Sequence, residues 1–122
     1  YDLRFPEQFR VMVPETEFFI VPANWPEART SHWKTLLAAR AIENQCYVAG
    51  VNCCGDMDGQ YYSGDSGVYA PDGSLLVPTK EIRLADDSCK EEKLLVYDIQ
   101  NDVTKIRDAF PVLQDRKEMK CS

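Results

Sequence analysis

Histidine is nearly absent from this sequence, which contains only His32. The five cysteines, at positions 46, 53, 54, 89 and 121, show no C-x-x-C spacing. Zinc sites commonly draw on cysteine pairs at that spacing, and a single histidine cannot complete such a site unaided. The sequence therefore gives no basis for a metal centre. A dyad of His32 with Cys53 or Cys54 stays open as a self-contained nucleophilic site.

Long apolar runs and a basic excess are also missing. The longest compact apolar cluster, Phe18-Phe19-Ile20-Val21, is far shorter than the roughly 18 residues that a membrane span needs. Lys and Arg number 14 against 20 Asp and Glu, a net charge of -6, which disfavours nucleic acid and anionic membranes as partners. An odd number of cysteines without a framework spacing suits a reducing compartment, so we expect a cytoplasmic protein.

The nucleophile elbow of serine hydrolases is absent, because Gly64-Asp65-Ser66-Gly67 does not match G-x-S-x-G. We interpret Ser66 as a strand serine near the sheet core or a pocket rim. With 122 residues, of which 44% are hydrophobic and 28% charged, the chain has the composition of a folded protein and the length of one domain at most.

The first half of the sequence predicts a helix, a strand and a longer helix. Pro6 to Val13 can open with proline in the first turn, and Glu17 to Val21 is typical of a fully buried strand. Two prolines make Pro22 to Pro26 a loop at the carboxyl end of that strand. Ser31 to Gln45 has helical spacing of apolar residues and can be capped by Thr30 or Ser31.

The second half predicts mostly strands. We expect strands over residues 47–52, 61–70, 74–77 and 93–99, turns at 56–59 and 71–73, and a charged loop over 80–92. A helix capped by Asn101 or Asp102 should run to Phe110 and stop at Pro111, leaving 111–122 as an arm. Such an order predicts an α/β sheet of about five strands with helices on one face. The bare face and edge would then need a missing half or a partner to cover them.

Three ordered blocks carry a family resemblance. They are Tyr1 to Glu7 (YDLRFPE), Pro22 to Pro26 (PANWP) with His32-Trp33 and Ala39 to Val48 (ARAIENQCYV), and Tyr62 to Ser66 (YSGDS) with Pro71-Asp72-Gly73 and Phe110-Pro111-Val112. On these blocks, which span almost the whole chain, the sequence resembles the second half of the carbon–nitrogen hydrolases of the nitrilase superfamily. Among the branches it is most similar to the ω-amidases.

The resemblance implies a fold and a catalytic set. Residues 1–122 would form the C-terminal half of one domain, a four-layer α-β-β-α sandwich about twice this length. The family uses a Glu-Lys-Cys set without a metal or organic cofactor. Its nucleophilic cysteine would stand immediately before Tyr1, with the glutamate and lysine further upstream, so this chain alone should be inactive. The missing N-terminal half would be one partner, and a second copy, paired through helices of this half, another.

The implied reaction is hydrolysis of an amide through a cysteine thioester. The thiolate attacks the carbonyl, ammonia leaves after protonation by the glutamic acid, and water cleaves the thioester. Donors that are already in place stabilise the oxyanion, each typically contributing about 3 kcal/mol. By resemblance, one donor is the backbone N–H of Tyr1 and the other is the lysine.

Arg4 and Trp25 are the expected substrate-binding side chains. Arg4 matches a family arginine four residues after the nucleophile, and a guanidinium can hold a carboxylate through two parallel hydrogen bonds. Its alternative is a structural salt bridge with Glu7 or Glu43. Trp25, at a strand's carboxyl end, would be a wall against the carbon chain of the substrate. Its alternative is a place in the core.

Several neighbouring polar residues are expected to be structural. Asp2 and Glu7 would hold the loop after the nucleophile through hydrogen bonds. Arg40 and Glu43 lie three apart on the long helix and could pair. The resemblance makes Glu43 and Asn44 architectural.

Two hypotheses of different class remain at this point. The first is an amidase acting in the full-length protein on a small amide, for which 2-oxo acid amides such as 2-oxoglutaramate are the leading substrates. N-carbamoyl amino acids and deaminated glutathione are alternatives within the same superfamily. The second is a non-catalytic interaction piece that kept the fold. The residue before Tyr1 would discriminate them.

Overall fold

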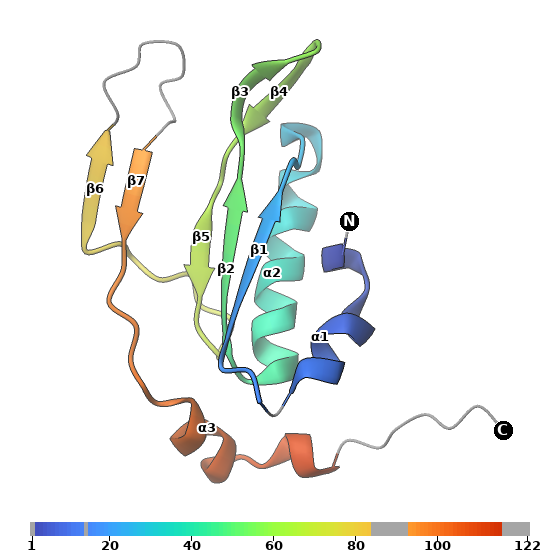
Figure 1. Cartoon of the computed structure of the whole chain (residues 1–122), viewed down its shortest axis with the longest axis vertical. Coiled ribbons are helices and arrows are strands. Elements are labelled where there is room, and N and C mark those ends of the chain that lie inside the picture. Colours follow the sequence, from blue (N-terminus) through green and yellow to red (C-terminus); the bar gives the residue numbers. More distant parts are fainter. Residues whose placement is uncertain (1, 14, 84–92, 116–122) are drawn as a thin grey trace, which may run out of the picture.

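A three-stranded sheet forms the centre of the molecule (Figure 1). The computed structural model describes residues 2–13, 15–83 and 93–115. Strand β1 (Phe18–Ala23) runs parallel to β2 (Tyr47–Asn52), from Phe18 opposite Tyr47 to Ala23 opposite Asn52. Strand β5 (Gly67–Tyr69) pairs antiparallel with the other edge of β2. The expected α/β class is therefore confirmed.

Helices cover one face of this sheet (Figure 1). They are η1 (Asp2–Arg4, a 3-10 helix), α1 (Pro6–Met12), η2 (Glu27–Arg29, also 3-10) and α2 (Thr30–Asn44). Proline occupies the first turn of α1 as predicted, because its missing N–H would have no partner there. In the described part of the chain, no helix is long and apolar enough to cross a membrane.

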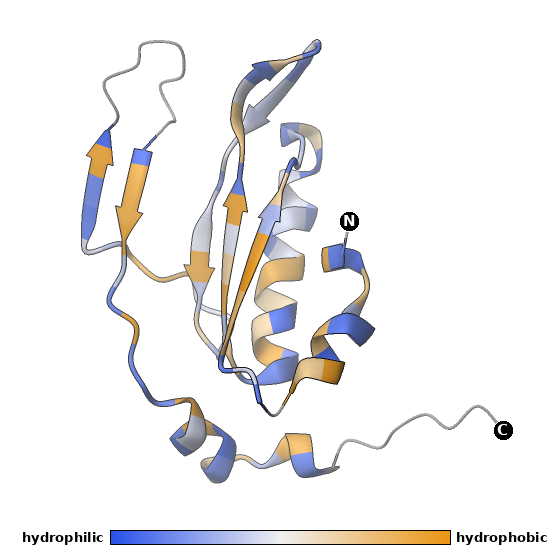
Figure 2. Ribbon diagram, in the orientation of Figure 1, coloured by the Kyte–Doolittle hydropathy of each residue, from blue (hydrophilic) through white to orange (hydrophobic). Residues whose placement is uncertain are grey.

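The long helix α2 supplies the core. Its side chains Trp33, Leu37 and Ala41 are fully buried against Phe19 and Val48 of the sheet. Figure 2 shows apolar residues along the strands and on α2. The helical spacing predicted from the sequence is thus confirmed, since the buried residues recur every three or four positions.

The predicted hydroxyl cap of α2 is wrong. Arg29 occupies the cap position without a side-chain bond, and Thr30 is already helical. The Thr30 hydroxyl donates instead to an oxygen of Asp65 at 3.2 Å and lies 3.1 Å from the Ser63 hydroxyl. A tertiary contact has therefore displaced the local cap.

The first strand differs from the fully buried strand that was predicted. Ile20 is 66% exposed, and β1 continues through Pro22 and Ala23 rather than stopping at Val21. Proline is tolerated because β1 is an edge strand, where a missing backbone N–H breaks no ladder bond on the free side.

Two predictions for the β region are also wrong. The strand expected over 61–70 is divided into β4 (Gln60–Ser63) and β5, because Gly64 and Asp65 both adopt positive φ, 79° and 53°. Strand β4 forms a hairpin with β3 (Cys54–Met57). The loop expected over 80–92 begins as β6 (Lys80–Arg83), which pairs with β7 (Lys93–Val96), and 84–92 lie outside the described residues.

The sheet consequently has three strands, not about five, and the other strands form two hairpins. Residues 74–77 make no strand and contribute one bridge, from Leu75 to Tyr69. The turn at 71–73 is confirmed, with the Gly73 N–H donating to Ala70 O at 2.8 Å.

The chain ends with α3 (Val103–Ala109) and η3 (Val112–Asp115), a 3-10 helix where an arm was expected. The remainder of the predicted arm, 116–122, lies outside the described residues. Asp102 occupies the cap position of α3, but its carboxylate accepts from the Tyr47 hydroxyl at 2.8 Å. The second face of the sheet is partly covered by Val103 of α3, whereas Val51 is 51% exposed.

Candidate functional site

The carboxyl ends of the parallel strands β1 and β2 hold the loop that carries Trp25. Asn52, the last residue of β2, binds both backbone groups of Trp25. The Trp25 N–H donates to Asn52 Oδ1 at 2.7 Å, and Asn52 Nδ2 donates to Trp25 O at 2.9 Å. Ligand sites in α/β sheets commonly lie beyond the carboxyl ends of parallel strands, so this position fits a pocket wall.

Trp25 is both part of the core and close to the surface. Its side chain is 6% exposed, and its Nε1 donates to Arg29 O at 2.7 Å. The ring packs against that of Trp33 with centroids 5.6 Å apart, and Trp33 Nε1 donates to Asp65 O at 2.8 Å. The alternative role of Trp25, a place in the core, therefore also holds, because its ring is buried and packs against Trp33.

The other predicted binding residue meets Trp25. The Arg4 guanidinium carbon lies over the Trp25 ring, 4.9 Å from its centroid. Such a contact favours the cation electrostatically, and a guanidinium carries five N–H donors in a planar arrangement that suits a carboxylate. Arg4 is exposed, at the end of η1. The structure therefore brings Arg4 and Trp25 together, while Tyr1 lies outside the described residues.

The nearby carboxylate considered for Arg4 has other partners. Glu43 pairs with Arg40 at 3.3 Å and with Arg10 at 3.8 Å. The predicted Arg40–Glu43 pair is confirmed, and Arg40 also donates through Nε to Leu3 O at 3.1 Å. This buried arginine ties η1, and with it Arg4, to the middle of α2.

A hydroxyl–carboxylate cluster fixes the bend between β4 and β5. The Ser63 hydroxyl donates to Asp65 Oδ2, and Lys34 Nζ lies 3.6 Å from Asp65 Oδ1. Together with the bond from Thr30, these contacts hold the bend against the start of α2. Ser66, next along the chain, accepts from the Asn52 N–H at 2.8 Å, which agrees with a structural serine.

The residues of the alternative nucleophilic site belong to separate elements, His32 to α2 and Cys54 to β3, and the dyad stays a prediction. The Cys53 thiol points to Asn52 Oδ1 at 3.8 Å, while His32 is exposed on α2. Burial raises the pKa of the Cys46 thiol to about 12, which leaves it protonated and inert at neutral pH. Among the described residues, no group of three His, Cys, Asp or Glu side chains could hold a metal ion.

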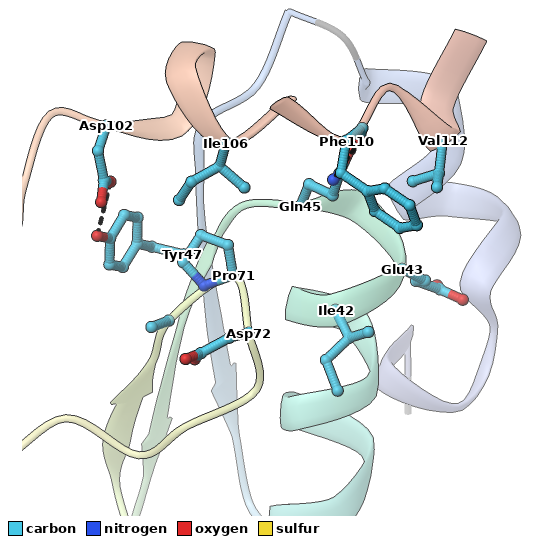
Figure 3. Close-up of a pocket in the computed structure, with 11 residues that line it drawn as sticks. Ile42, Glu43, Gln45, Tyr47, Pro71, Asp72, Asp102, Ile106, Phe110 and Val112 are labelled. Atoms are coloured by element: carbon cyan, nitrogen blue, oxygen red, sulfur yellow. Dashed lines mark hydrogen bonds between the residues drawn. The ribbon is translucent and has the colours of Figure 1, made fainter. Parts of the chain in front are cut away.

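Two hollows lie away from Arg4 and Trp25. One, of about 700 Å³, is at the opposite end of the sheet between the end of α2 and α3 (Figure 3). Tyr47 and Asp102 face each other there, and burial followed by the Asp102 hydrogen bond raises the pKa of Tyr47 to about 12. The other, of about 930 Å³, is a groove between the β2–β5 face and the β6–β7 hairpin, where Cys53 and Cys54 lie.

The profile of the carbon-nitrogen hydrolase family matches residues 1–108 of the 122-residue chain. The chain belongs to this family. The match includes Arg4, Trp25 and Asn52, so the residues that the structure gathers lie within the family's own domain.

Curated relatives carry amidase names. The 2-oxoglutaramate amidase of Bacillus subtilis (strain 168) is 35% identical over 122 residues, which cover 98% of this chain and 44% of that protein. Omega-amidase YafV of Yersinia enterocolitica is 41% identical over 118 residues, covering 94% of this chain and 42% of that protein. The chain thus spans less than half the length of these relatives.

A solved structure agrees with the fold. XC1258 of Xanthomonas campestris, a CN-hydrolase superfamily protein whose active site holds an arsenic adduct, aligns over all of this chain and 46% of its own. The TM-score is 0.79 and the sequence identity 35%. The nitrilase-type fold expected from the sequence is therefore confirmed.

Asn52 is the residue of this region that sequence reasoning missed. The only signal was an asparagine ending a predicted strand, which is common for a turn. Its pairing with a loop 27 residues earlier depends on the parallel register of β1 and β2.

Proposed function

We propose that this chain is the C-terminal half of an ω-amidase, which hydrolyses the terminal amide of 2-oxo acid amides such as 2-oxoglutaramate. The observation that carries the proposal is the Arg4 guanidinium seated on Trp25 beyond the carboxyl ends of β1 and β2. Together they present a cation and an apolar surface in one place, which suits a short substrate with a carboxylate at one end. The amidase names of relatives at 35% and 41% identity support the same reading.

The bond-breaking residues stand upstream of the described residues in this proposal. A cysteine immediately before Tyr1 attacks the amide carbon, and the Tyr1 N–H and an upstream lysine stabilise the oxyanion. An upstream glutamic acid protonates the departing ammonia and then activates the water that hydrolyses the thioester. No metal or organic cofactor takes part.

Arg4 and Trp25 then act on the other end of the substrate. The guanidinium donates two parallel hydrogen bonds to the carboxylate, and the indole face lines the carbon chain. Arg4 follows Tyr1 by three positions in the sequence and lies on η1, which suits a carboxylate site close to the proposed oxyanion site. Arg40 supports that segment through its bond to Leu3 O.

Ammonia release by the full-length protein tests this proposal. We expect turnover of 2-oxoglutaramate well above that of N-carbamoyl amino acids and deaminated glutathione. Preferred turnover of either alternative would move the protein to another branch of the family. Absence of turnover on all three, with serine or alanine before Tyr1, would indicate a non-catalytic interaction piece.

We further propose that the full-length protein is a cytoplasmic homodimer. Exposed apolar side chains flank the hollow of Figure 3, with Ile42 52% and Phe110 66% exposed, and their burial by a second copy would favour association. The reduced cysteines Cys46, Cys53 and Cys54 fit a reducing compartment. Light scattering of the full-length protein measures its oligomeric state, and a stable monomer at micromolar concentration would contradict the homodimer.

A further inference from the structure

Asn52 makes a two-point contact with the backbone of Trp25. Its Oδ1 accepts from Trp25 N–H at 2.7 Å, and its Nδ2 donates to Trp25 O at 2.9 Å. The pair fixes the orientation of the amide, because a flipped amide would oppose donor to donor and acceptor to acceptor. The contact lies two residues beyond Ala23, the last residue of β1 that is paired with β2.

Asn52 is itself held on both backbone groups. Its N–H donates to Ser66 Oγ at 2.8 Å, and the Ser66 hydroxyl lies 3.3 Å from Asn52 O. The residue is half-buried at the end of β2. A rigid strand end therefore dictates where the Trp25 backbone lies.

The position of the Trp25 backbone decides where Arg4 can sit. The indole packs against the Trp33 ring, with centroids 5.6 Å apart, and the Arg4 guanidinium lies over it. Arg4 is exposed, so the ring is the main surface that limits its many rotamers. Loss of the Asn52 contact would let the loop that carries Trp25 move. The Trp25 ring would move with it, and the Arg4 guanidinium would lose its fixed position.

We propose that Asn52 is a positioning residue that sets the preference of the enzyme for amides bearing a carboxylate. This inference rests on the proposed amidase function and deepens it. Asn52 does not touch the substrate. Asn52 positions Trp25, and Trp25 in turn positions Arg4. Asn52 therefore affects binding of the substrate's carboxylate and leaves the chemistry at the cysteine unchanged.

The test uses the full-length protein and compares two amides with the same carbon backbone, one with a free carboxylate and one with that carboxylate as its methyl ester. Asn52→Ala removes both bonds, and Asn52→Asp sets a carboxylate oxygen against Trp25 O. For both variants we expect the ratio of kcat/KM for the acidic over the neutral amide to fall about tenfold to hundredfold, since misplacement by about 1 Å has effects of that size. The change should lie in KM for the acidic amide. Asn24→Ala, at an exposed position of the same loop, should leave the ratio unchanged.

Circular dichroism in the near ultraviolet, which reports the packing of Trp25 against Trp33, identifies the variants that fold. If neither Asn52 variant folds, Ser66→Ala tests the inference instead. It removes the hydroxyl that holds the Asn52 backbone, so it should lower the ratio of kcat/KM for the acidic over the neutral amide by a smaller factor. An equal loss on both amides, or an unchanged ratio in folded variants, overturns the inference. A wild-type protein that hydrolyses neither amide overturns the proposed function instead.

Discussion

Single side chains of this protein have roles that depend on what lies beside them. Arg4 belongs to η1 and Arg40 contacts it, yet the first is exposed over an aromatic ring and the second is buried and bonded to Leu3 O and Glu43. We expect the first to bind an anion and the second to hold the backbone. Substitutions at the two positions should therefore be distinguishable.

Replacing Arg4 by alanine should raise KM for acidic amides by about ten- to a hundredfold, because a hydrogen bond to a charged group contributes roughly 1.5–3 kcal/mol. Folding should be unchanged, since Arg4 is exposed. Steady-state kinetics of the full-length protein measure KM, and a thermal melt measures its stability. Arg10→Ala, which removes an exposed arginine that pairs with Glu43, is the control and should leave KM unaltered. An Arg4→Ala variant that unfolds, without a selective effect on substrate, would make Arg4 structural.

Cys46 should make stability depend on alkaline pH. Burial raises its pKa to about 12 in the folded chain, so at pH values well below the ordinary thiol pKa of 9.0 the thiol is protonated in both states and stability is unaffected. Above pH 9 the unfolded thiol ionises first, and the free energy of unfolding falls by up to about 1.4 kcal/mol per pH unit until the folded thiol ionises as well.

Urea unfolding of the full-length protein at pH 8 and pH 10.5 measures this loss. We expect a smaller loss in Cys46→Ala, with Cys53→Ala, at a less buried thiol, behaving as wild type. Tyr47, whose pKa is also raised to about 12, leaves a residual loss in every variant. Identical losses in the two cysteine variants would contradict the role of Cys46.

At the scale of elements, α2 and β2 meet more closely than their sequences suggest. A Cβ at Gly50 would lie 2.5 Å from Leu37 Cδ1 and 2.7 Å from Trp33 Cζ2. Glycine is needed here for space, since the helix packs directly on the strand. We expect Gly50→Ala to destabilise the protein by about 1–3 kcal/mol, the usual cost of overpacking a core. Chemical denaturation checks this, with Thr35→Ala on the exposed side of α2 expected within about 0.5 kcal/mol of wild type.

The end of α2 depends on a residue of α3. Arg107 donates to three carbonyls around this end, Thr16 O at 2.8 Å, Asn44 O at 3.1 Å and Gln45 O at 3.3 Å. A cation near a helix C-terminus also favours the helix dipole. Arg107→Ala should lower the free energy of unfolding by about 1–3 kcal/mol, as buried carbonyls lose their partner. Arg107→Lys keeps the charge and should recover part of the lost free energy of unfolding. Full recovery would show that the charge of Arg107, and not its hydrogen bonds, stabilises the protein.

For the whole molecule, the uncovered sheet face is the main feature. Ile20 of β1 and Val51 of β2 are 66% and 51% exposed, and Val51 lines the groove bounded by the β6–β7 hairpin. An apolar surface of this kind is typical of an interface. The 122-residue chain expressed alone should therefore bind a hydrophobic dye and show no amidase activity, whereas the full-length protein should bind little dye and be active. Activity of the chain alone would contradict the upstream position of the catalytic residues.

The sequence by itself determined the elements whose residues repeat with a clear period. Helix α2 and strand β2 were predicted within a residue of their ends, because their burial patterns are local properties of the chain. The family blocks likewise pointed to Arg4 and Trp25 from residue identity alone, and the substrate-binding role of these two residues stays a prediction.

Tertiary structure decided the rest. It divided residues 61–70 into two strands, since positive φ at Gly64 and Asp65 is stabilised by contacts with α2 that lie some 30 residues away in sequence. It also placed Arg4 on Trp25 and Trp25 on Asn52, through the parallel register of β1 and β2. Such pairings join residues with no shared local pattern, so only the packed chain could specify them.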